Sequence, residues 1–269
     1  MAKLIDCITF FDNNYIFDFR YNVIKNHVDK FIVCESLFDH KNNPKKINFD
    51  FENKYKNNPQ VIHLVLKDPF PKKTNSWQNQ AIQREYILEN LGFANDEDYI
   101  MFSDPDEIPN PDVLKGIDLK NKFGVFNQLF FNYKFNLFNP HETPWDGTRI
   151  CKKKNLKSID DLRNKIKAKN LGYNFLRFDK EKNIQVFANA GWHFNNIMSP
   201  ENISLKLKTF AHKEYSSDKF SSVENIKDKI NKKIDLFGRG YSYKAIKIDN
   251  RFPKYLRENL DKYKKFIID

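Results

Sequence analysis

The first 35 residues alternate between a strand pattern and a helix pattern, and this order constrains the fold more than any other feature. Residues 4–11 form an apolar run that indicates a strand, and residues 31–34 form a second one. Between these runs, apolar side chains recur at helical spacing: Ile16, Phe19, Val23 and Ile24. A strand, a helix and a second strand in so short a stretch are typical of the βαβ unit of an α/β protein.

Further elements continue this alternation. Residues 61–66 predict a third strand, and residues 76–91 predict a helix that ends at Gly92. Residues 123–138 are dense in aromatic side chains, as two strands of a hairpin or one bent strand would be. We therefore expect an α/β fold with a mostly parallel central sheet flanked by helices.

A short apolar run, residues 99–102, is followed directly by the acidic residues Asp104, Asp106 and Glu107. In a covered parallel sheet, ligands collect just beyond the carboxyl ends of the strands. Asp104 and Asp106 are two residues apart, so their side chains share a face in extended backbone, which Pro105 favours. Two such carboxylates suit Mg²⁺ or Mn²⁺, with water and phosphate as the other ligands. Taken alone, the pattern fits a solvated turn that caps the next helix equally well.

One basic residue interrupts the apolar face of the predicted helix 76–91. Arg84 lies on the same stripe as four apolar residues: Trp77, Ala81, Leu88 and Leu91. An arginine on a buried face needs an anion, which a neighbouring carboxylate or a ligand phosphate could supply. An internal salt bridge or a side chain that reaches out to solvent remains the structural alternative.

The composition favours a globular protein with acidic partners. The chain has 269 residues, 40% hydrophobic content and a formal net charge of +11. Such a charge favours nucleotides, nucleic acid, anionic glycans or an anionic membrane surface as partners. The lysines are spread along the chain rather than gathered in one tract, so dedicated nucleic-acid binding is not indicated.

The three cysteines and the apolar runs bear on the compartment. Cys7, Cys34 and Cys151 are odd in number and lack CxxC spacing, which is typical of reduced core thiols in a cytosolic protein. No signal peptide and no run of the ~20 apolar residues of a membrane span is visible. We expect one domain, with residues 1–118 as a nucleotide-binding half and residues 119–269 as an acceptor-side half ending in helices.

Two later segments have more than one interpretation. Trp145 lies in a predicted loop, residues 139–148, where it either stacks on a sugar face or anchors the loop. Residues 253–268 carry an apolar helical face surrounded by lysines: Leu256, Leu260, Tyr263 and Ile267. This segment either docks on the domain or lies on a membrane surface.

Together these features suggest a phosphate-bearing ligand held by a metal ion, which permits two enzyme classes. One is sugar transfer from a nucleotide donor, and the other is metal-assisted phosphoester hydrolysis. A two-metal hydrolase would need more carboxylates than the cluster at Asp104–Glu107 provides. Transfer with a single metal ion needs only the acidic pair and one further ligand, with a separate carboxylate to deprotonate the acceptor hydroxyl.

The chain also resembles glycosyltransferase family 17, the family of the bisecting β-1,4-mannosyl-glycoprotein N-acetylglucosaminyltransferase. The resemblance covers nearly the whole chain and rests on ordered motifs. They include Ser103-Asp104-Pro105-Asp106-Glu107-Ile108-Pro109, Trp145-Asp146-Gly147-Thr148, Gly191-Trp192-His193-Phe194 and His212-Lys213-Glu214. It implies a GT-A-like Rossmann-type α/β fold, a nucleotide-sugar donor, a divalent cation (Mn²⁺ or Mg²⁺) and inversion at the anomeric carbon.

The resemblance also implies roles on the donor side of the site. Asp104 and Asp106 resemble the metal- and diphosphate-binding pair, and Glu107 would orient them or touch the donor sugar. His193 would be a further metal or phosphate ligand. Arg84 would pair with the diphosphate or with Asp104, and Phe11 and Glu35 would border a nucleotide that we expect to be UDP.

On the acceptor side, Glu214 and Asp146 are the candidate general bases, with Glu214 preferred. Trp145, Trp192 and His212 are the candidate acceptor-binding residues. The chain lacks the membrane anchor of the animal enzyme, so we expect a cytoplasmic enzyme of a bacterial or viral surface glycan, in peripheral contact with a membrane at most. N-acetylglucosamine is one candidate sugar. A glycan- or nucleotide-binding protein without catalysis and a metal-dependent phosphoesterase are the alternatives.

Overall fold

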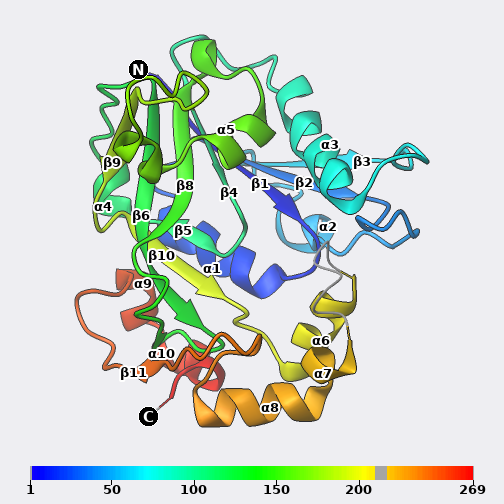
Figure 1. The fold of residues 1–269 in the computed structure, drawn as a ribbon. Helices are drawn as coiled ribbons and strands as arrows, with labels where there is room; N and C mark the ends of the chain where they lie inside the picture. The colour runs from blue at the N-terminus through cyan, green and yellow to red at the C-terminus, as the bar shows by residue number, and fades with distance from the viewer. Residues whose placement is uncertain (1, 210–216, 269) are drawn as a thin grey trace.

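The computed structural model describes residues 2–209 and 217–268. Four parallel strands form the first half of the central sheet, in the spatial order β3-β2-β1-β4. They follow the strand patterns of the sequence, and their carboxyl ends all point toward the same edge (Figure 1). The strands are β1 (Leu4–Phe10), β2 (Lys30–Ser36), β3 (Val61–Leu66) and β4 (Tyr99–Ser103).

The second half of the sheet is mixed. β8 runs antiparallel to β4, and β6 runs antiparallel to β8. β6 also pairs in parallel with β9 and β10, and β10 pairs antiparallel with β5. A late strand therefore returns beside the chain that leaves β4. The strands are β5 (Glu107–Pro109), β6 (Phe123–Asn132), β7 (Leu137–Phe138), β8 (Trp145–Lys152), β9 (Ile184–Phe187), β10 (Gly191–Asn195) and β11 (Lys244–Ala245).

Alternate side chains of β1 face two separate cores. Leu4 and Ile8 pack in the core that includes α1, α9 and α10, whereas Ile5 and Cys7 pack in the core with α3 and α5. Figure 1 shows α1 on one side of the sheet and α3 and α5 on the other. The bounds are α1 (Asn14–Ile24), α3 (Ser76–Glu89), α5 (Ile159–Lys165), α9 (Lys254–Arg257) and α10 (Leu260–Tyr263).

A third, smaller core lies under the remaining helices of the second half. Ile203 and Leu207 of α6 pack there with Ile226 of α8 and with Leu137 at the end of the sheet. The other helical segments are α2 (Phe51–Lys54), α4 (Pro111–Leu114), α6 (Pro200–Thr209), α7 (Asp218–Ser221), α8 (Val223–Lys232), η1 (Lys153–Asn155), η2 (Ala168–Gly172) and η4 (Lys264–Phe266).

The predicted helix at 76–91 is confirmed as α3, and of its predicted inward stripe Arg84 and Leu91 are buried, but Trp77 is not. Trp77 is 51% exposed, while Asn79, Gln80, Gln83 and Arg84 are buried. The helix therefore buries a largely polar face. Its N-terminus is fixed by a capping box in which Asn75 is the N-cap residue.

Two other segments are shorter than the sequence indicated. The basic, amphipathic pattern of residues 158–169 predicts one helix, but α5 ends at Lys165 and Ile166 has extended backbone. Residues 253–268 form α9, α10 and η4 instead of one helix. Their apolar side chains dock on α1: Leu256 and Tyr263 are buried, and the Tyr263 ring lies 5.1 Å from that of Phe19.

The α/β class with a central sheet flanked by helices is confirmed. The three cysteines are buried and unpaired, as expected of core thiols. Within residues 2–209 and 217–268, none of the helices combines the length and the apolar content that a bilayer crossing requires.

Candidate active site

A cavity of about 240 Å³ opens at the carboxyl ends of β1 and β4. Its walls come from segments far apart in the sequence, which the sheet topology brings together. The lining includes Phe10, Phe11, Asp12 and Asn13 after β1, Asp104 and Asp106 after β4, Gln80 and Gln83 of α3, His193 and Asn195 of β10, and Lys206 of α6.

A buried arginine holds the chain that leaves β4. Arg20 of α1 is fully buried and donates two hydrogen bonds to the carboxylate of Asp6 in β1. The same guanidinium donates to the Glu107 carbonyl and to the Ser103 hydroxyl. A bidentate arginine–carboxylate pair is rigid, so Arg20 fixes the position of the turn between β4 and β5. We call this turn, residues 104–106, the acidic turn.

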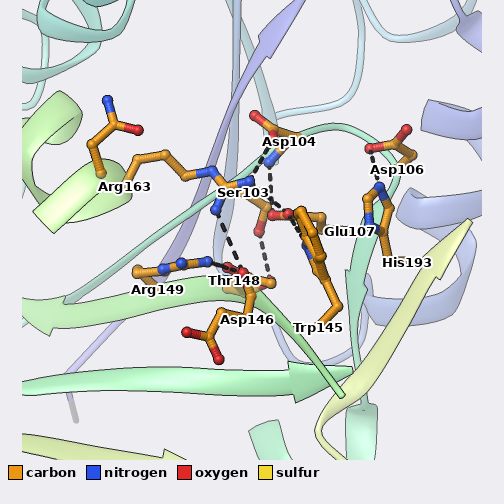
Figure 2. Close-up of polar contacts among 12 residues, drawn as sticks. Ser103, Asp104, Asp106, Glu107, Trp145, Asp146, Thr148, Arg149, Arg163 and His193 are labelled. Carbon is orange, nitrogen blue, oxygen red and sulfur yellow. Dashed lines mark hydrogen bonds and ion pairs between the residues drawn. The ribbon is translucent and has the colours of Figure 1, made fainter. Parts of the chain in front are cut away.

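Glu107 is the centre of the polar network in Figure 2. Its carboxylate is fully buried and accepts hydrogen bonds from the Arg163 guanidinium (2.7 Å) and from the Trp145 indole (2.6 Å). Its second oxygen accepts from the backbone N–H of Asp104 at 3.1 Å. Because both oxygens are engaged, the geometry suits Glu107 to orienting the acidic turn rather than to removing a proton.

Asp104 lies between two arginines. Nη2 of Arg163 donates to its Oδ2 at 2.7 Å, and Nη2 of Arg84 lies 3.7 Å from its Oδ1. Desolvation raises the pKa of the Asp104 carboxyl, but Arg163 and Arg84 outweigh it and hold that pKa well below its usual value. Arg84 has a closer carboxylate partner in Asp160, at 2.8 Å. The anion that a buried-face Arg84 requires is thus already present in the protein.

Asp106 faces His193 on the other side of the turn. Its Oδ1 lies 3.4 Å from Nε2 of His193, and its Oδ2 lies 4.0 Å from Nζ of Lys206. Burial raises the pKa of Asp106, but His193 and Lys206 outweigh it and lower that pKa from its ordinary value. Figure 2 shows the Asp106 carboxylate and the His193 ring pointing toward each other, apart from the Glu107 network.

His193 reaches this position because β10 pairs with β5. In that pairing His193 lies opposite Glu107, and the backbone N–H of Phe194 donates to the Asp106 carbonyl at 2.8 Å. The imidazole packs against Phe130 (4.3 Å between ring centroids) and Trp145 (5.0 Å). Its Nδ1 is buried and has no hydrogen-bond partner among the described residues, so ring packing sets its orientation.

The residues around Asp106 fit a hard divalent cation in part. The 3.4 Å between its oxygen and the His193 nitrogen is close to the separation of about 3 Å between neighbouring ligands of an octahedral Mg²⁺ or Mn²⁺. Nowhere in the described ranges do three His, Cys, Asp or Glu side chains converge as a metal site. A cation held by Asp106 and His193 would therefore share its remaining positions between a ligand phosphate and water, as such ions commonly do.

Two candidate site residues, Trp145 and Asp146, lie on β8, but only Trp145 contacts Glu107 and His193. Trp145 begins the strand instead of lying in the predicted loop, and its ring covers His193 while its indole N–H is bonded to Glu107. The carboxylate of Asp146 points away from the acidic turn in Figure 2 and accepts from the backbone N–H of Ala168 at 2.9 Å. The buried Arg149 donates to the Asp146 carbonyl and keeps this segment in place.

Of the residues expected to border the nucleotide, one lines the cavity and one does not. Phe11 is on the cavity wall, with Nζ of Lys45 5.5 Å from its ring centroid. Glu35 is fully buried and binds Lys45 and the backbone N–H groups of Asn48 and Phe49. Burial raises the pKa of Glu35, yet His63 and Lys45 bring it below its usual value. Glu35 therefore holds the segment behind the cavity in place.

The remaining candidates are Trp192, His212 and Glu214. Trp192 is 5% exposed, packs in the core beside α1 and donates its indole N–H to the Arg251 carbonyl. The cavity lining does not include it. His212 and Glu214 lie outside the described residues.

The sequence did not single out Arg163 or the polar residues of α3. Arg163 belongs to a predicted basic helix in which no pattern distinguishes it from the neighbouring lysines. Gln80 and Gln83 lie outside the apolar stripe predicted for α3, so the sequence pattern does not mark them. His40 also lines the cavity and is bonded to Gln83 at 2.9 Å.

Comparisons with known proteins bear on the family. A family model described as glycosyltransferase family 17 matches residues 1–268. None of the curated proteins matches the chain at a significant level.

Several solved structures have a broad likeness to the chain. Glucosyl-3-phosphoglycerate synthase from Mycobacterium tuberculosis, solved with Mn²⁺, UDP and phosphoglyceric acid, is 11% identical over 95% of this chain and 91% of that one, with a TM-score of 0.37. A glycosyltransferase involved in glycosylation of the major capsid of PBCV-1 is 12% identical over 70% and 82%, with a TM-score of 0.32. HddC from Yersinia pseudotuberculosis is 13% identical over 73% and 91%, with a TM-score of 0.38. With scores this low, the family model is the finding that carries the assignment.

Proposed function

Because the chain belongs to glycosyltransferase family 17, we propose that it transfers a sugar from a nucleotide-sugar donor to a hydroxyl of a glycan acceptor, with a divalent cation and with inversion at the anomeric carbon. The donor is a UDP-sugar in this proposal, and N-acetylglucosamine is the first sugar to test. Glycosyl transfer itself follows from the family, whereas the cation, donor and acceptor are the proposal.

The observation that carries the proposal is the pairing of Asp106 with His193 beside Asp104, on the wall of a cavity at the strand ends. A carboxylate and an imidazole that lie this close together suit a cation that is completed by a diphosphate. Lys206 lies on the same wall, 4.0 Å from Asp106, and adds positive charge where a diphosphate would gain negative charge on leaving.

The two acids of the turn have different tasks in this proposal. Asp106 and His193 would hold Mn²⁺ or Mg²⁺, which would neutralise the charge that grows on the departing diphosphate. Asp104 has one oxygen bonded to Arg163 and the other facing Arg84, so it would position the turn and meet the cation or the diphosphate only with its partly exposed edge. Glu107 would keep Asp104 in place by accepting a hydrogen bond from its backbone N–H.

The acceptor side is assigned by residue type and by the family motifs. Glu214 would deprotonate the acceptor hydroxyl, because the carboxylates of Asp146 and Glu107 are engaged elsewhere. Trp145, with His212, would border the acceptor, and Phe11 would border the nucleotide.

A donor panel with Mn²⁺ tests the proposal. We expect release of nucleoside diphosphate with one donor and an acceptor glycan, and its loss in Asp106→Asn. Asp249→Asn, which changes a carboxylate paired with Arg251 away from the cavity, is the matched control and should stay active. Nucleotide binding without turnover of any donor would indicate a binding protein, and release of inorganic phosphate without sugar transfer would indicate a phosphoesterase. Either result would overturn the proposal.

A further inference from the structure

The segment between η2 and β9 exposes an unusual amount of apolar surface. Residues 171–179 are all exposed. Five of the ten exposed large hydrophobic side chains of the described residues fall within this stretch: Leu171, Tyr173, Phe175, Leu176 and Phe178. Phe175 is 77% exposed, Leu176 61% and Phe178 87%. Exposed apolar clusters of this kind commonly mark an interaction site.

Basic side chains flank this exposed apolar segment, residues 171–178, which we call the tip. Residues 165–182 contain six basic and two acidic residues. Asp179 is already paired with Arg177 (2.7 Å) and Lys180 (3.2 Å), and Glu181 lies 3.7 Å from Lys122. Within residues 2–209 and 217–268, no carboxylate forms an ion pair with the other basic residues on either side of the tip: Lys167, Lys169 and Lys182.

From this arrangement we propose that residues 171–178 dock the protein on an anionic membrane surface. Phe175, Leu176 and Phe178 enter the interfacial region of the bilayer, and the flanking lysines lie at the level of anionic headgroups. Aromatic and aliphatic side chains flanked by basic residues are the combination that binds such interfaces. The charge of the whole chain, +11, adds to the attraction.

A second copy of the chain fits this surface less well. A two-fold interface places the same patch opposite itself. Lys167, Lys169 and Lys182 would then face their own copies, and like charges across an interface are repulsive. A bilayer with anionic lipids supplies both the apolar layer and the negative charge.

The position of the segment is compatible with an active site that stays open. Figure 1 places β9 near the N-terminus, at the end of the molecule opposite α8 and the C-terminus. The cavity lies at the carboxyl ends of β1 and β4, and none of residues 171–178 lines it. Docking through this tip therefore leaves the cavity free. The docking element is also distinct from residues 253–268, whose apolar face packs on α1.

Vesicle flotation with the full chain tests the proposal. We expect binding to vesicles of equimolar phosphatidylcholine and phosphatidylglycerol, little binding to phosphatidylcholine alone, and weaker binding at high salt. The double variant Phe175→Ser/Phe178→Ser should bind at least about tenfold more weakly. Phe93→Ser, at an exposed phenylalanine elsewhere on the surface, should bind like the wild type.

Three outcomes would overturn the proposal: no binding of the wild type to anionic vesicles, equal binding by the double variant, or a wild-type dimer in sedimentation that the double variant loses. Both variants change exposed side chains, so their thermal unfolding should match that of the wild type, and this is measured on the same samples.

Discussion

At the scale of single residues, the acidic turn divides into two unlike carboxylates. Asp104 is held by Arg163 and faces Arg84, whereas Asp106 faces an imidazole and, at 4.0 Å, one lysine. Both pKa values lie below the ordinary value, so both side chains are ionised at neutral pH. Of the two carboxylates, only that of Asp106 lies beside an imidazole nitrogen, the Nε2 of His193, which is a common metal ligand. Asp104 is therefore one partner of a structural ion pair, whereas Asp106 lies in a position suited to a cation.

This division predicts that the two asparagine variants fail in different ways. Asp106→Asn should lower kcat/KM by at least about 100-fold, because loss of even an outer-shell partner of a metal site costs about 10–100-fold. Its thermal stability should fall less than that of Asp104→Asn, because Asp106 faces a histidine and a more distant lysine instead of two arginines. Asp104→Asn should lower stability as well as activity, since it leaves Arg163 and Arg84 with one carboxylate fewer. Equal stability of the two variants would contradict the division.

Arg163 connects Asp104 with the buried Glu107, and its removal tests the network. Arg163→Met should destabilise the fold by about 3–5 kcal/mol, the range for leaving one partner of a buried pair alone. Adding Glu107→Gln should restore part of that loss in a urea-unfolding double-mutant cycle. Arg251→Met, which removes an arginine of an exposed pair, is the control and should leave stability nearly unchanged. Additive effects of the two buried changes would show that Arg163 and Glu107 are not coupled.

At the scale of elements, the pairing of β10 with β5 brings His193 to the acidic turn. Gly191 begins β10 with φ +146°, and a Cβ there would lie 2.2 Å from the Ile108 carbonyl oxygen. Only glycine allows the two backbones to approach this closely. The geometry of the site thus depends on a residue that contributes no side chain to it.

Gly191→Ala should therefore separate β10 from β5 and displace His193 from Asp106. We expect a loss of unfolding free energy of at least about 2 kcal/mol, from the strained backbone conformation and the contact with Ile108. Gly116→Ala is the matched control, because a Cβ at Gly116 meets no atom within 4 Å. Urea unfolding of both variants measures the difference. Wild-type stability and activity in Gly191→Ala would show that β10 tolerates the shift.

The elements also show what the sequence could and could not predict. The strands of the first half have apolar runs bounded by polar turns, so local pattern was sufficient for them. The face of α3 was not predictable in this way, because its buried residues Asn79, Gln80 and Gln83 are polar, and the two glutamines line the cavity. Likewise, Arg163 reaches Asp104 only through tertiary packing of α5 against the sheet. Contacts of this kind leave no periodic signal in one sequence.

At the scale of the whole molecule, stability should depend on pH through carboxylates that are wholly or partly buried. The pKa values of Asp104, Asp106 and Glu35 are lowered in the folded chain, by Arg163, His193 and Lys45 among others, although burial acts against the shift. A lowered folded pKa stabilises the fold above the unfolded value and loses this contribution as the pH falls.

The urea midpoint should accordingly stay level above about pH 5 and decline below about pH 4, where unfolded carboxyls titrate. The decline should be shallower in Arg163→Met, because that arginine is the largest of the contributions that lower the pKa of Asp104. Parallel curves for the two proteins would mean that Asp104 contributes nothing to the acid dependence.

The central claim is that Asp106 and His193 hold a divalent cation that binds the diphosphate of the donor. The most direct test is calorimetric titration of UDP into the wild type, Asp106→Asn and Asp249→Asn. Each protein is titrated once in the presence of Mn²⁺ and once in the presence of a chelator. The account predicts that Mn²⁺ makes UDP bind at least about tenfold tighter to the wild type and to Asp249→Asn, and that this gain is absent in Asp106→Asn. Equal UDP affinity with and without Mn²⁺, or an unchanged Mn²⁺ effect in Asp106→Asn, would contradict it.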